Sequence, residues 1–391
     1  MQSSSNTRLS LPVIDLFAGI GGLSLGACRA GFDLRLAVES DRHACAAHKR
    51  NFFAASDSDA DICSLSGVRL LQLAGVRMGE LCGLIGGPPC QGFSSIGRRN
   101  VDDPRNALFR RFFQLAKETR PKFFLAENVP GILQDRYRSL RSSALNLVRD
   151  EYVLLDPFEV SAAEYGAPTT RSRVIFFGYL GSVFPSGFTR ADFDPPRGTV
   201  KVTVRDALRG LPSRIRDEWA TESKGWRVVR NWPMGPYGDK IKGHRPPGIG
   251  DREAILMLKR HRVSGCVSTL HTAEVRRRFA SLSFGERDGV SRASRLDPDG
   301  FCPTLRAGTD RDHGSYQAVR PIHPVEARVI TPREAARLQG FPDWFQFAPT
   351  KWHGFRQIGN SVSPILAEAL LNVVSARLGK SRTSLYSQRA A

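Results

Sequence analysis

Apolar runs near the N-terminus alternate with glycine turns and amphipathic segments. The segment LPVIDLF (11–17) is mostly apolar and leads at once into AGIGGLSLG, a glycine-rich turn that opens a helix. Such a run is typical of a strand buried on both faces of a parallel sheet. Strands are also predicted at 32–40, 81–87, 122–131, 152–162 and 173–180, and an amphipathic helix at 109–120. This alternation predicts an α/β fold with a doubly wound, mostly parallel sheet.

The pattern changes beyond about residue 180, where glycine, proline and arginine become frequent and periodicity weakens. Residues 225–250 show no helical face. Helical signals return at 331–342, after a Thr-Pro entry, and at 363–379, where apolar residues recur at helical spacing. We therefore expect a first domain at 1–180, an inserted, smaller, loop-rich domain at 181–350, and a segment at 351–391 whose helix completes the first domain.

The charge balance favours a polyanionic partner. The 391 residues include 57 Lys and Arg against 38 Asp and Glu, a net charge of +19, and residues 181–326 alone hold 26 basic and 17 acidic residues. Nucleic acid is the simplest such partner, and its binding weakens as salt rises. The seven cysteines are odd in number and form no CxxC pair, so neither a disulfide framework nor a metal centre is expected.

No targeting or membrane segment is expected. The first residues lack the apolar core of a signal peptide, and no apolar run approaches the length of a membrane span. Together with the cysteine usage, this predicts a reducing, cytoplasmic setting.

Three features after the first strands suit an adenosine-containing ligand. Gly19, Gly21 and Ser24 stand at the three glycine positions of the dinucleotide fingerprint GxGxxG, so the third position departs from it. Glu39 follows Gly19 by twenty residues, where an acid would hold ribose hydroxyls. Asp61 is placed to accept from an adenine amino group, although alone it is more typical of a turn acid or helix cap. These residues do not separate NAD from S-adenosylmethionine.

Cys90 stands in GGPPCQGFS (86–94), which can form neither a helix interior nor a central strand. A cysteine kept for packing would lie on an apolar face. A thiol on a stiff turn instead suits a nucleophile, whose thiolate is the reactive form.

Six motifs together carry a family resemblance. They are DLFAGIGGLSLG (15–26), GGPPCQGFS (86–94), ENVPGI (127–132), YGAPTTRSRVIFFG (165–178), RVITPREAARLQGFPDW (328–344) and FRQIGNSVSP (355–364). In these residues and in this order the chain resembles the DNA (cytosine-5) methyltransferases of prokaryotic restriction–modification systems. The resemblance implies a Rossmann-like S-adenosylmethionine-dependent catalytic domain (1–180 with 351–391) and an inserted target-recognition domain (181–350). It covers most of the chain and fails between about 181 and 327.

The resemblance also implies roles in catalysis. Cys90 would add to C6 of a cytosine, Glu127 would hydrogen-bond or protonate N3, Arg173 would contact O2, and Arg171 would order the site. Thr169 stands where the family usually has Gln, which is a departure from the motif at one supporting contact.

For S-adenosylmethionine, the resemblance implies adenine stacking on Phe17, ribose binding by Glu39 and adenine binding by Asp61. Further cofactor contacts are expected from Gly19, Gly21, Gly22, Pro89 and Asn360.

The substrate is expected to be duplex DNA, because C5 and C6 lie inside the base stack and the target base must be flipped out. Arg98 and Arg99 are expected to contact phosphates, and Thr304, in PTLRAG (303–308), to lie in a recognition element. A monomer associated with the nucleoid is expected. A partnership with a restriction endonuclease for the same site and a solitary regulatory role are equal alternatives.

Rival functions remain open at this point. A nicotinamide dehydrogenase would leave Cys90 and Glu127 without a role, and an amino-methyltransferase would carry an aromatic residue where Cys90 follows Pro88-Pro89. A transfer-RNA cytosine-5 methyltransferase shares the thiol mechanism, so charge does not exclude it. A non-catalytic DNA-binding module is a different class, and it would not need Cys90, Glu127 and the two arginines.

Overall fold

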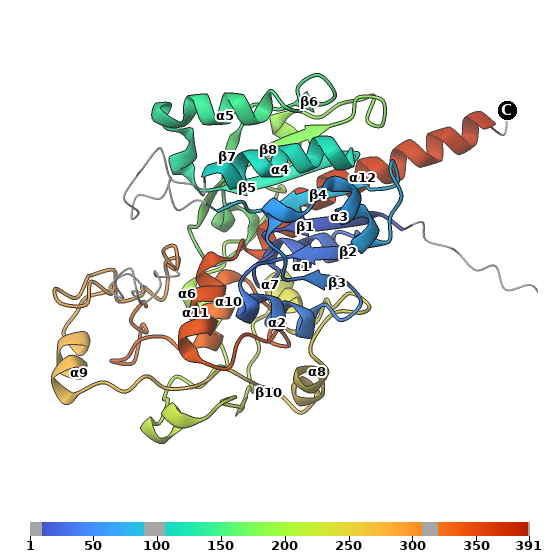
Figure 1. Cartoon of the computed structure of the whole chain (residues 1–391). Coiled ribbons are helices and arrows are strands. Elements are labelled where there is room, and N and C mark those ends of the chain that lie inside the picture. Colours follow the sequence, from blue (N-terminus) through green and yellow to red (C-terminus); the bar gives the residue numbers. More distant parts are fainter. Residues whose placement is uncertain (1–9, 90–105, 307–319, 390–391) are drawn as a thin grey trace, which may run out of the picture.

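The computed structural model describes residues 10–89, 106–306 and 320–389 (Figure 1). Its centre is a sheet in the order β3-β2-β1-β4-β5-β8-β6, with β7 also paired to β8. The strands are β1 (Pro12–Leu16), β2 (Asp33–Val38), β3 (Ser56–Ser58), β4 (Gly83–Gly86), β5 (Phe123–Asn128), β6 (Val153–Leu154), β7 (Phe158–Ser161) and β8 (Ser172–Tyr179). The predicted strands are thus present in the order expected.

The sheet is mixed. Strands β3, β2, β1, β4 and β5 are parallel, whereas β8 runs antiparallel to β5 and β6 and β7 run antiparallel to β8. The single strand predicted at 152–162 is wrong in detail, because the chain forms β6 and β7 on either side of Pro157. Proline has no backbone N–H to donate within a sheet, which explains the break.

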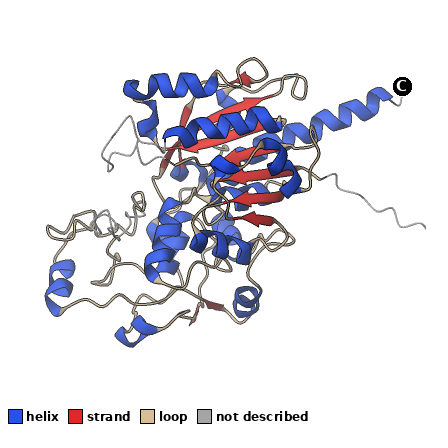
Figure 2. Cartoon of the chain, viewed as in Figure 1, coloured by secondary structure: helices blue, strands red, loops and turns tan. Residues whose placement is uncertain are grey.

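Helices cover both faces of the sheet (Figure 2). Successive strand residues point to opposite faces, so Val13 enters the apolar core under α1 (Gly22–Arg29), α2 (Arg42–Asn51) and α12 (Pro364–Arg389). Ile14 enters the core under α3 (Gly67–Ala74), α4 (Asn106–Thr119) and α5 (Arg138–Leu145). The predicted doubly wound α/β fold is confirmed.

The C-terminal helix lies directly on the first helix. A Cβ atom built on Gly26 of α1 would lie 2.3 Å from Cβ of Ala367 and 2.6 Å from the backbone nitrogen of Glu368. Leu370, Leu371 and other apolar side chains of α12 are buried in the same core as Val13. Segments from the two ends of the chain therefore share one packed layer.

Residues 181–350 contain short helices joined by long loops. The helices are α6 (Val204–Leu208), α7 (Gly235–Lys242), α8 (Arg252–Lys259), α9 (Ala273–Ala280) and α10 (Pro332–Gln339), and β9 (Arg227–Val228) pairs with β10 (Arg262–Val263). The expectation that 225–250 has no helical face is wrong at α7. Its two turns bury Tyr237 and Ile241, which are four residues apart, and so short a helix leaves little periodicity to detect.

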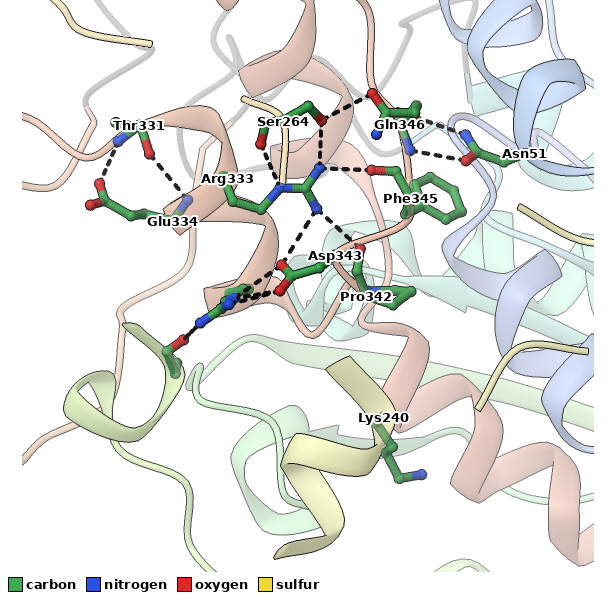
Figure 3. A network of polar contacts seen from close by, with 12 residues as sticks. Asn51, Lys240, Ser264, Thr331, Arg333, Glu334, Pro342, Asp343, Phe345 and Gln346 are labelled. Carbon is green, nitrogen blue, oxygen red and sulfur yellow. Dashed lines mark hydrogen bonds and ion pairs between the residues drawn. The ribbon is translucent and has the colours of Figure 1, made fainter. Parts of the chain in front are cut away.

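Two buried arginines of α10 tie together distant parts of residues 181–350 (Figure 3). Arg337 donates to both carboxylate oxygens of Asp343 and to the carbonyls of Ala207 and Arg209. Arg333 donates to the carbonyls of Ser264, Pro342 and Phe345.

A pair of amides extends this network to the sheet domain. Gln346 accepts from Ser264 through its side chain, and its backbone exchanges two hydrogen bonds with the Asn51 amide of α2. The side chains that surround α10 therefore join three parts of the sequence, namely α2, residues 207–264 and residues 331–346.

One stretch, Lys351–Leu378, has the length and apolar composition of a membrane span. It comprises α11 (Lys351–Asn360) and the first half of α12, and 67% of its most apolar window is buried inside the protein. That burial is typical of a core helix.

Replacing Gly26 tests the packing of α12 on α1. Alanine within a helix is normally favourable, but Gly26→Ala places a methyl group against Ala367, so we expect a loss of about 1–3 kcal/mol in the free energy of unfolding. Urea unfolding measures this loss. Gly289→Ala is the control, because a Cβ there meets no atom within 4 Å. An unchanged Gly26→Ala protein would contradict the close packing.

Removing Asp343 tests the polar network around α10. Asp343→Ala leaves the fully buried Arg337 without its carboxylate, and breaking such a pair typically costs about 3–5 kcal/mol. Urea unfolding should show this loss. Asp299→Ala, which removes the partner of the exposed Arg205, should leave the urea midpoint nearly unchanged.

Candidate active site

The site is predicted at the carboxyl edge of the parallel strands, where the sheet order reverses. From β1 the sheet continues through β2 and β3 on one side and through β4 and β5 on the other. Ligands in open α/β sheets bind in the crevice at such a reversal. The loops that leave β1, β2 and β4, together with the end of β5, carry Phe17, Glu39, Pro89 and Glu127, so the topology gathers these residues at one edge.

The turn after β1 is held in an uncommon backbone shape. Gly19 and Gly21 have positive φ angles of 57° and 96°, and the half-buried Phe17 also has a φ of 58°. A left-handed conformation is costly for a non-glycine residue and is typical of functional sites. A Cβ built on Gly19 would meet no atom within 4 Å. The turn therefore leaves open space above Gly19, where a ligand can approach the backbone.

Glu39 is tied to this turn by backbone hydrogen bonds. Its Oε2 accepts from the N–H of Gly19 at 2.8 Å, and its Oε1 accepts from the N–H of Asp41 at 2.8 Å. Burial raises the pKa of the carboxyl group, and these two hydrogen bonds oppose that rise. Each carboxylate oxygen can accept more than one hydrogen bond, so Glu39 keeps capacity for a pair of hydroxyl donors. The turn and this acid fit an adenosine-containing cofactor.

Asp61 and Asn360 occupy different surroundings. Asp61 is exposed, and its Oδ1 accepts from the N–H of Cys63 at 3.0 Å, so it caps a short 3₁₀ turn; its adenine contact stays a prediction. Asn360 is exposed at the end of α11, two residues before Val362. The carbonyl oxygen of Val362 would lie 2.2 Å from a Cβ on Gly22, which places the Asn360 segment beside the glycine turn.

The acid and arginine motifs meet across neighbouring strands. Glu127 of β5 forms an ion pair with Arg173 of β8, and both residues are largely buried. A Cβ built on Gly87 would lie 2.9 Å from Oε2 of Glu127, so the turn after β4 passes directly over this carboxylate. The amide of Asn128 donates to the carbonyl of Pro88 at 3.2 Å, which fixes that turn.

Three predicted residues lie outside the described part of the chain: Cys90, Arg98 and Arg99. Pro89, half-buried, is the last residue described before them. Cys90 is thus one residue beyond a turn that is anchored over Glu127.

Arg171 connects the site to the predicted recognition element. Its Nη1 donates to the carbonyl of Leu305 at 3.2 Å. Beside it, the N–H of Thr170 donates to the carbonyl of Cys302 and the N–H of Cys302 donates to the carbonyl of Pro168. Thr304 is exposed on the segment between these contacts, so the structure brings it next to the arginine motif.

Burial disfavours the thiolate at other cysteines. It raises the pKa of Cys28 and of Cys266 to about 12 and raises that of Cys302 further. Desolvation also raises the pKa of Cys45 and Cys63. These five therefore stay protonated near neutral pH, which leaves them poor nucleophiles.

Sequence reasoning missed two features of this edge. Gly87 was not singled out, although its missing side chain admits Glu127. Asp15 lies fully buried in β1 and hydrogen-bonds Ser24. The signal for Asp15 was present, since it is the single charged residue in an otherwise apolar strand.

Known proteins of similar sequence support one family. The profile described as C-5 cytosine-specific DNA methylase matches residues 11–376. The type II methyltransferase M.XorII of Xanthomonas oryzae pv. oryzae is 39% identical over 363 residues, 91% of this chain and 82% of the relative. The type II methyltransferase M1.HphI of Haemophilus parahaemolyticus is 30% identical, over 94% of this chain and 87% of the relative.

Solved structures agree. A crystal structure described as a DNA modification methyltransferase encoded within an E. coli prophage matches with a TM-score of 0.86 and 49% identity, over 95% of this chain and all of the other. The S. pombe Dnmt2 methyltransferase matches at 18% identity, with a TM-score of 0.59 over 95% of this chain and 99% of its own, which shows the shared fold alone.

The resemblance drawn from the six motifs, the cytosine-5 activity and the S-adenosylmethionine cofactor are thereby confirmed, and the dehydrogenase, amino-methyltransferase, transfer-RNA and non-catalytic alternatives are not favoured. The chain belongs to the C-5 cytosine-specific DNA methylase family and is a DNA (cytosine-5-)-methyltransferase that takes its methyl group from S-adenosylmethionine.

Proposed function

We propose that Cys90, Glu127, Arg171 and Arg173 carry the methylation of a flipped-out cytosine. The observation that supports this most is the convergence of the Gly87–Pro89 turn on the Glu127–Arg173 pair. The proposal requires that the thiol of Cys90, the next residue in the sequence, reach a base held by the pair. Addition of its thiolate to C6 breaks the aromatic ring and makes C5 a carbon nucleophile.

Glu127 and Arg173 suit the edge of a cytosine that lies opposite the attacking sulfur. A carboxyl group can donate to N3 or accept from the exocyclic amine, and a guanidinium can donate to O2. Hydrogen bonding at N3 and O2 withdraws electrons from C6 and so favours addition of the thiolate. After C5 has taken the methyl group, a base removes the C5 proton, the C5–C6 double bond re-forms, and the sulfur leaves.

S-adenosylmethionine supplies an electrophilic methyl group on a sulfonium. Phe17, Gly19, Gly21, Gly22, Glu39, Asp61, Pro89 and Asn360 are the residues proposed to hold it. Glu39 would accept from the ribose hydroxyls, and the open backbone of the glycine turn would take the methionine part.

Residues 181–350 are proposed as the target-recognition domain, inserted between a catalytic part at 1–180 and the completing segment at 351–391. Arg98 and Arg99 are proposed to contact phosphates. Thr304 is proposed to contact DNA, and its support is the bonded contact between its segment and Arg171.

The relatives named type II methyltransferases support a restriction–modification role, with an endonuclease that cuts the same site. All proposed site residues lie in one chain, so we propose a monomer, which sedimentation velocity tests. A DNA substrate and a net charge of +19 support a cytoplasmic, nucleoid-associated enzyme.

Replacing Cys90 tests the covalent step. Cys90→Ser should abolish methyl transfer, because a hydroxyl is a far weaker nucleophile at C6, while duplex DNA binding persists. Transfer of labelled methyl groups followed by bisulfite sequencing reports the activity and the modified base. Cys63→Ser, at an exposed cysteine, is the matched control and should remain active. Near-normal methylation by Cys90→Ser would exclude this nucleophile.

Trapping the covalent intermediate tests the bond between the Cys90 sulfur and C6 of the cytosine directly. A duplex with 5-fluorocytosine at the methylated position cannot lose a C5 proton, so the adduct should persist and peptide mapping should place it on Cys90. An adduct on another cysteine would overturn the assignment.

Replacing Glu127 separates proton transfer from positioning. Glu127→Gln keeps the shape of the side chain but cannot transfer a proton, so kcat should fall by about 10²–10⁴-fold. DNA affinity should change much less. A melting curve controls for the loss of the buried ion pair with Arg173. A folded Glu127→Gln enzyme with normal kcat would exclude the acid role.

A further inference from the structure

A chain of four buried polar side chains runs beneath the glycine turn. Ser24 Oγ lies 2.5 Å from Oδ2 of Asp15 and 3.1 Å from Nε2 of His48. On the other side of the ring, Nδ1 of His48 lies 2.6 Å from Oδ1 of Asp57. Asp15, Ser24 and His48 are fully buried, and the Asp57 side chain is 4% exposed. This chain of side chains therefore joins β1, α1, α2 and β3 in a place largely shielded from solvent.

This order of Ser, His and Asp is also that of a nucleophilic triad. A triad must present its hydroxyl to a substrate, however, and Ser24 is fully buried and already hydrogen-bonded to Asp15. Burial thus excludes a hydrolytic use and leaves a role inside the fold.

Counting protons shows what the chain requires. Ser24 has one hydroxyl proton, yet its oxygen stands between Asp15 and His48. In one arrangement, a protonated Asp15 donates to Ser24, Ser24 donates to Nε2, and the Nδ1 proton faces Asp57. In the other, Ser24 donates to an ionised Asp15, and the His48 ring carries both of its protons.

The two arrangements contain the same number of protons, and each has a net charge of −1. If that shared proton is lost, two protons remain for the three contacts Asp15–Ser24, Ser24–His48 and His48–Asp57. Two lone pairs must then face each other at one contact, which is costly in a buried site. The geometry is complete when one proton is shared between Asp15 and His48.

This row of polar side chains packs against the glycine turn through His48 and its neighbour Phe52. A Cβ built on Gly21 would lie 2.4 Å from the Phe52 ring and 2.9 Å from Cδ2 of His48. The His48 and Phe52 rings stack with centroids 4.3 Å apart. A shift of the His48 ring would therefore move the surface on which Gly21 rests.

The surroundings of Asp15 favour its protonated form. Burial raises the pKa of Asp15 to about 7, the hydrogen bond from Ser24 opposes this, and the carboxylate of Glu39 raises it further. Among the other titratable groups, Cys28 of α1 faces Asp15, Cys45 of α2 faces Asp57, and Glu39 faces Asp15 and His48. β4 has no titratable side chain, and Glu368 of α12 is paired with Arg29 and Lys240.

We propose that Asp15, Ser24, His48 and Asp57 are positioning residues that share one proton, and that this proton keeps the glycine turn in its cofactor-binding shape. The proposal rests on the proposed placement of S-adenosylmethionine at that turn. Its consequence is that cofactor affinity decreases as pH rises through neutrality and the shared proton is lost.

Asp15→Asn is the sharpest test. The amide permanently donates to Ser24, so this variant completes the chain without a titrating proton. Isothermal titration with S-adenosylmethionine from pH 6 to pH 8.5 should show that the wild-type Kd rises about tenfold more than the variant Kd. The α-amino group of the cofactor titrates near pH 8, but it does so with both proteins and cancels in the ratio. Ser24→Ala, which breaks the chain, should bind weakly at every pH without the extra slope.

Stability provides a second readout without cofactor. The pKa of Asp15 is higher in the folded protein than the usual 3.8, at about 7. Its stabilising contribution is complete below pH 4 and is lost as pH rises to 7. The melting temperature of Asp15→Asn relative to wild type should therefore rise between pH 4 and pH 7.

Nitrogen NMR of the His48 ring reports the shared proton directly. The Nε2 signal of wild type should change with pH together with the cofactor affinity, whereas that of Asp15→Asn should not. Equal pH slopes of Kd in the two proteins would overturn the proposal. If a folded Glu39→Ala enzyme binds the cofactor as tightly as wild type, the placement of the cofactor at this turn fails instead.

Discussion

The antiparallel entry of β8 beside β5 is the constraint on which the predicted site depends. Parallel strands bring the loops after β1, β2 and β4 to one edge, so acids and glycines at strand ends meet there. The arginines, however, lie at the start of β8. Because β8 runs antiparallel to β5, its first residues arrive at the edge where β5 ends, and Arg173 meets Glu127. A parallel β8 would have placed Arg171 and Arg173 at the opposite edge of the sheet.

Buried charge holds residues 181–350 together, and amide hydrogen bonds between Gln346 and Asn51 join them to the sheet domain. Arg337 and Asp343 are fully buried, and an unpaired charge there would be far more costly than an exposed one. The pair is satisfied only when the carbonyls of Ala207 and Arg209 are also in place. The same region then reaches Arg171 through Leu305. A backbone carbonyl of residues 181–350 therefore holds a buried arginine of that motif.

The sequence predicted those features that local chemistry dictates. Apolar runs located the strands, the glycines located the turn, and six motifs identified the family. Features that arise from tertiary packing were not predicted. Arg333 and Arg337 are charged residues that a helical pattern assigns to the surface, yet both are buried. Ser24 and His48 are 24 residues apart, and no spacing rule connects them. The helix α7 was missed because two turns carry too few apolar positions. Cys90, Arg98 and Arg99 lie outside the described residues, so their roles rest on sequence.

The ion pairs differ in how completely their atoms are used, and this difference separates structural charge from charge available for chemistry. Arg337 donates hydrogen bonds to Asp343 and to two backbone carbonyls. Glu127 contacts Arg173, and its other side faces Gly87, which has no side chain to cover it. A carboxylate can accept several hydrogen bonds, so Glu127 can engage a base while it still orients Arg173. A glycine at position 87 thus keeps this acid accessible from the turn that leads to Cys90.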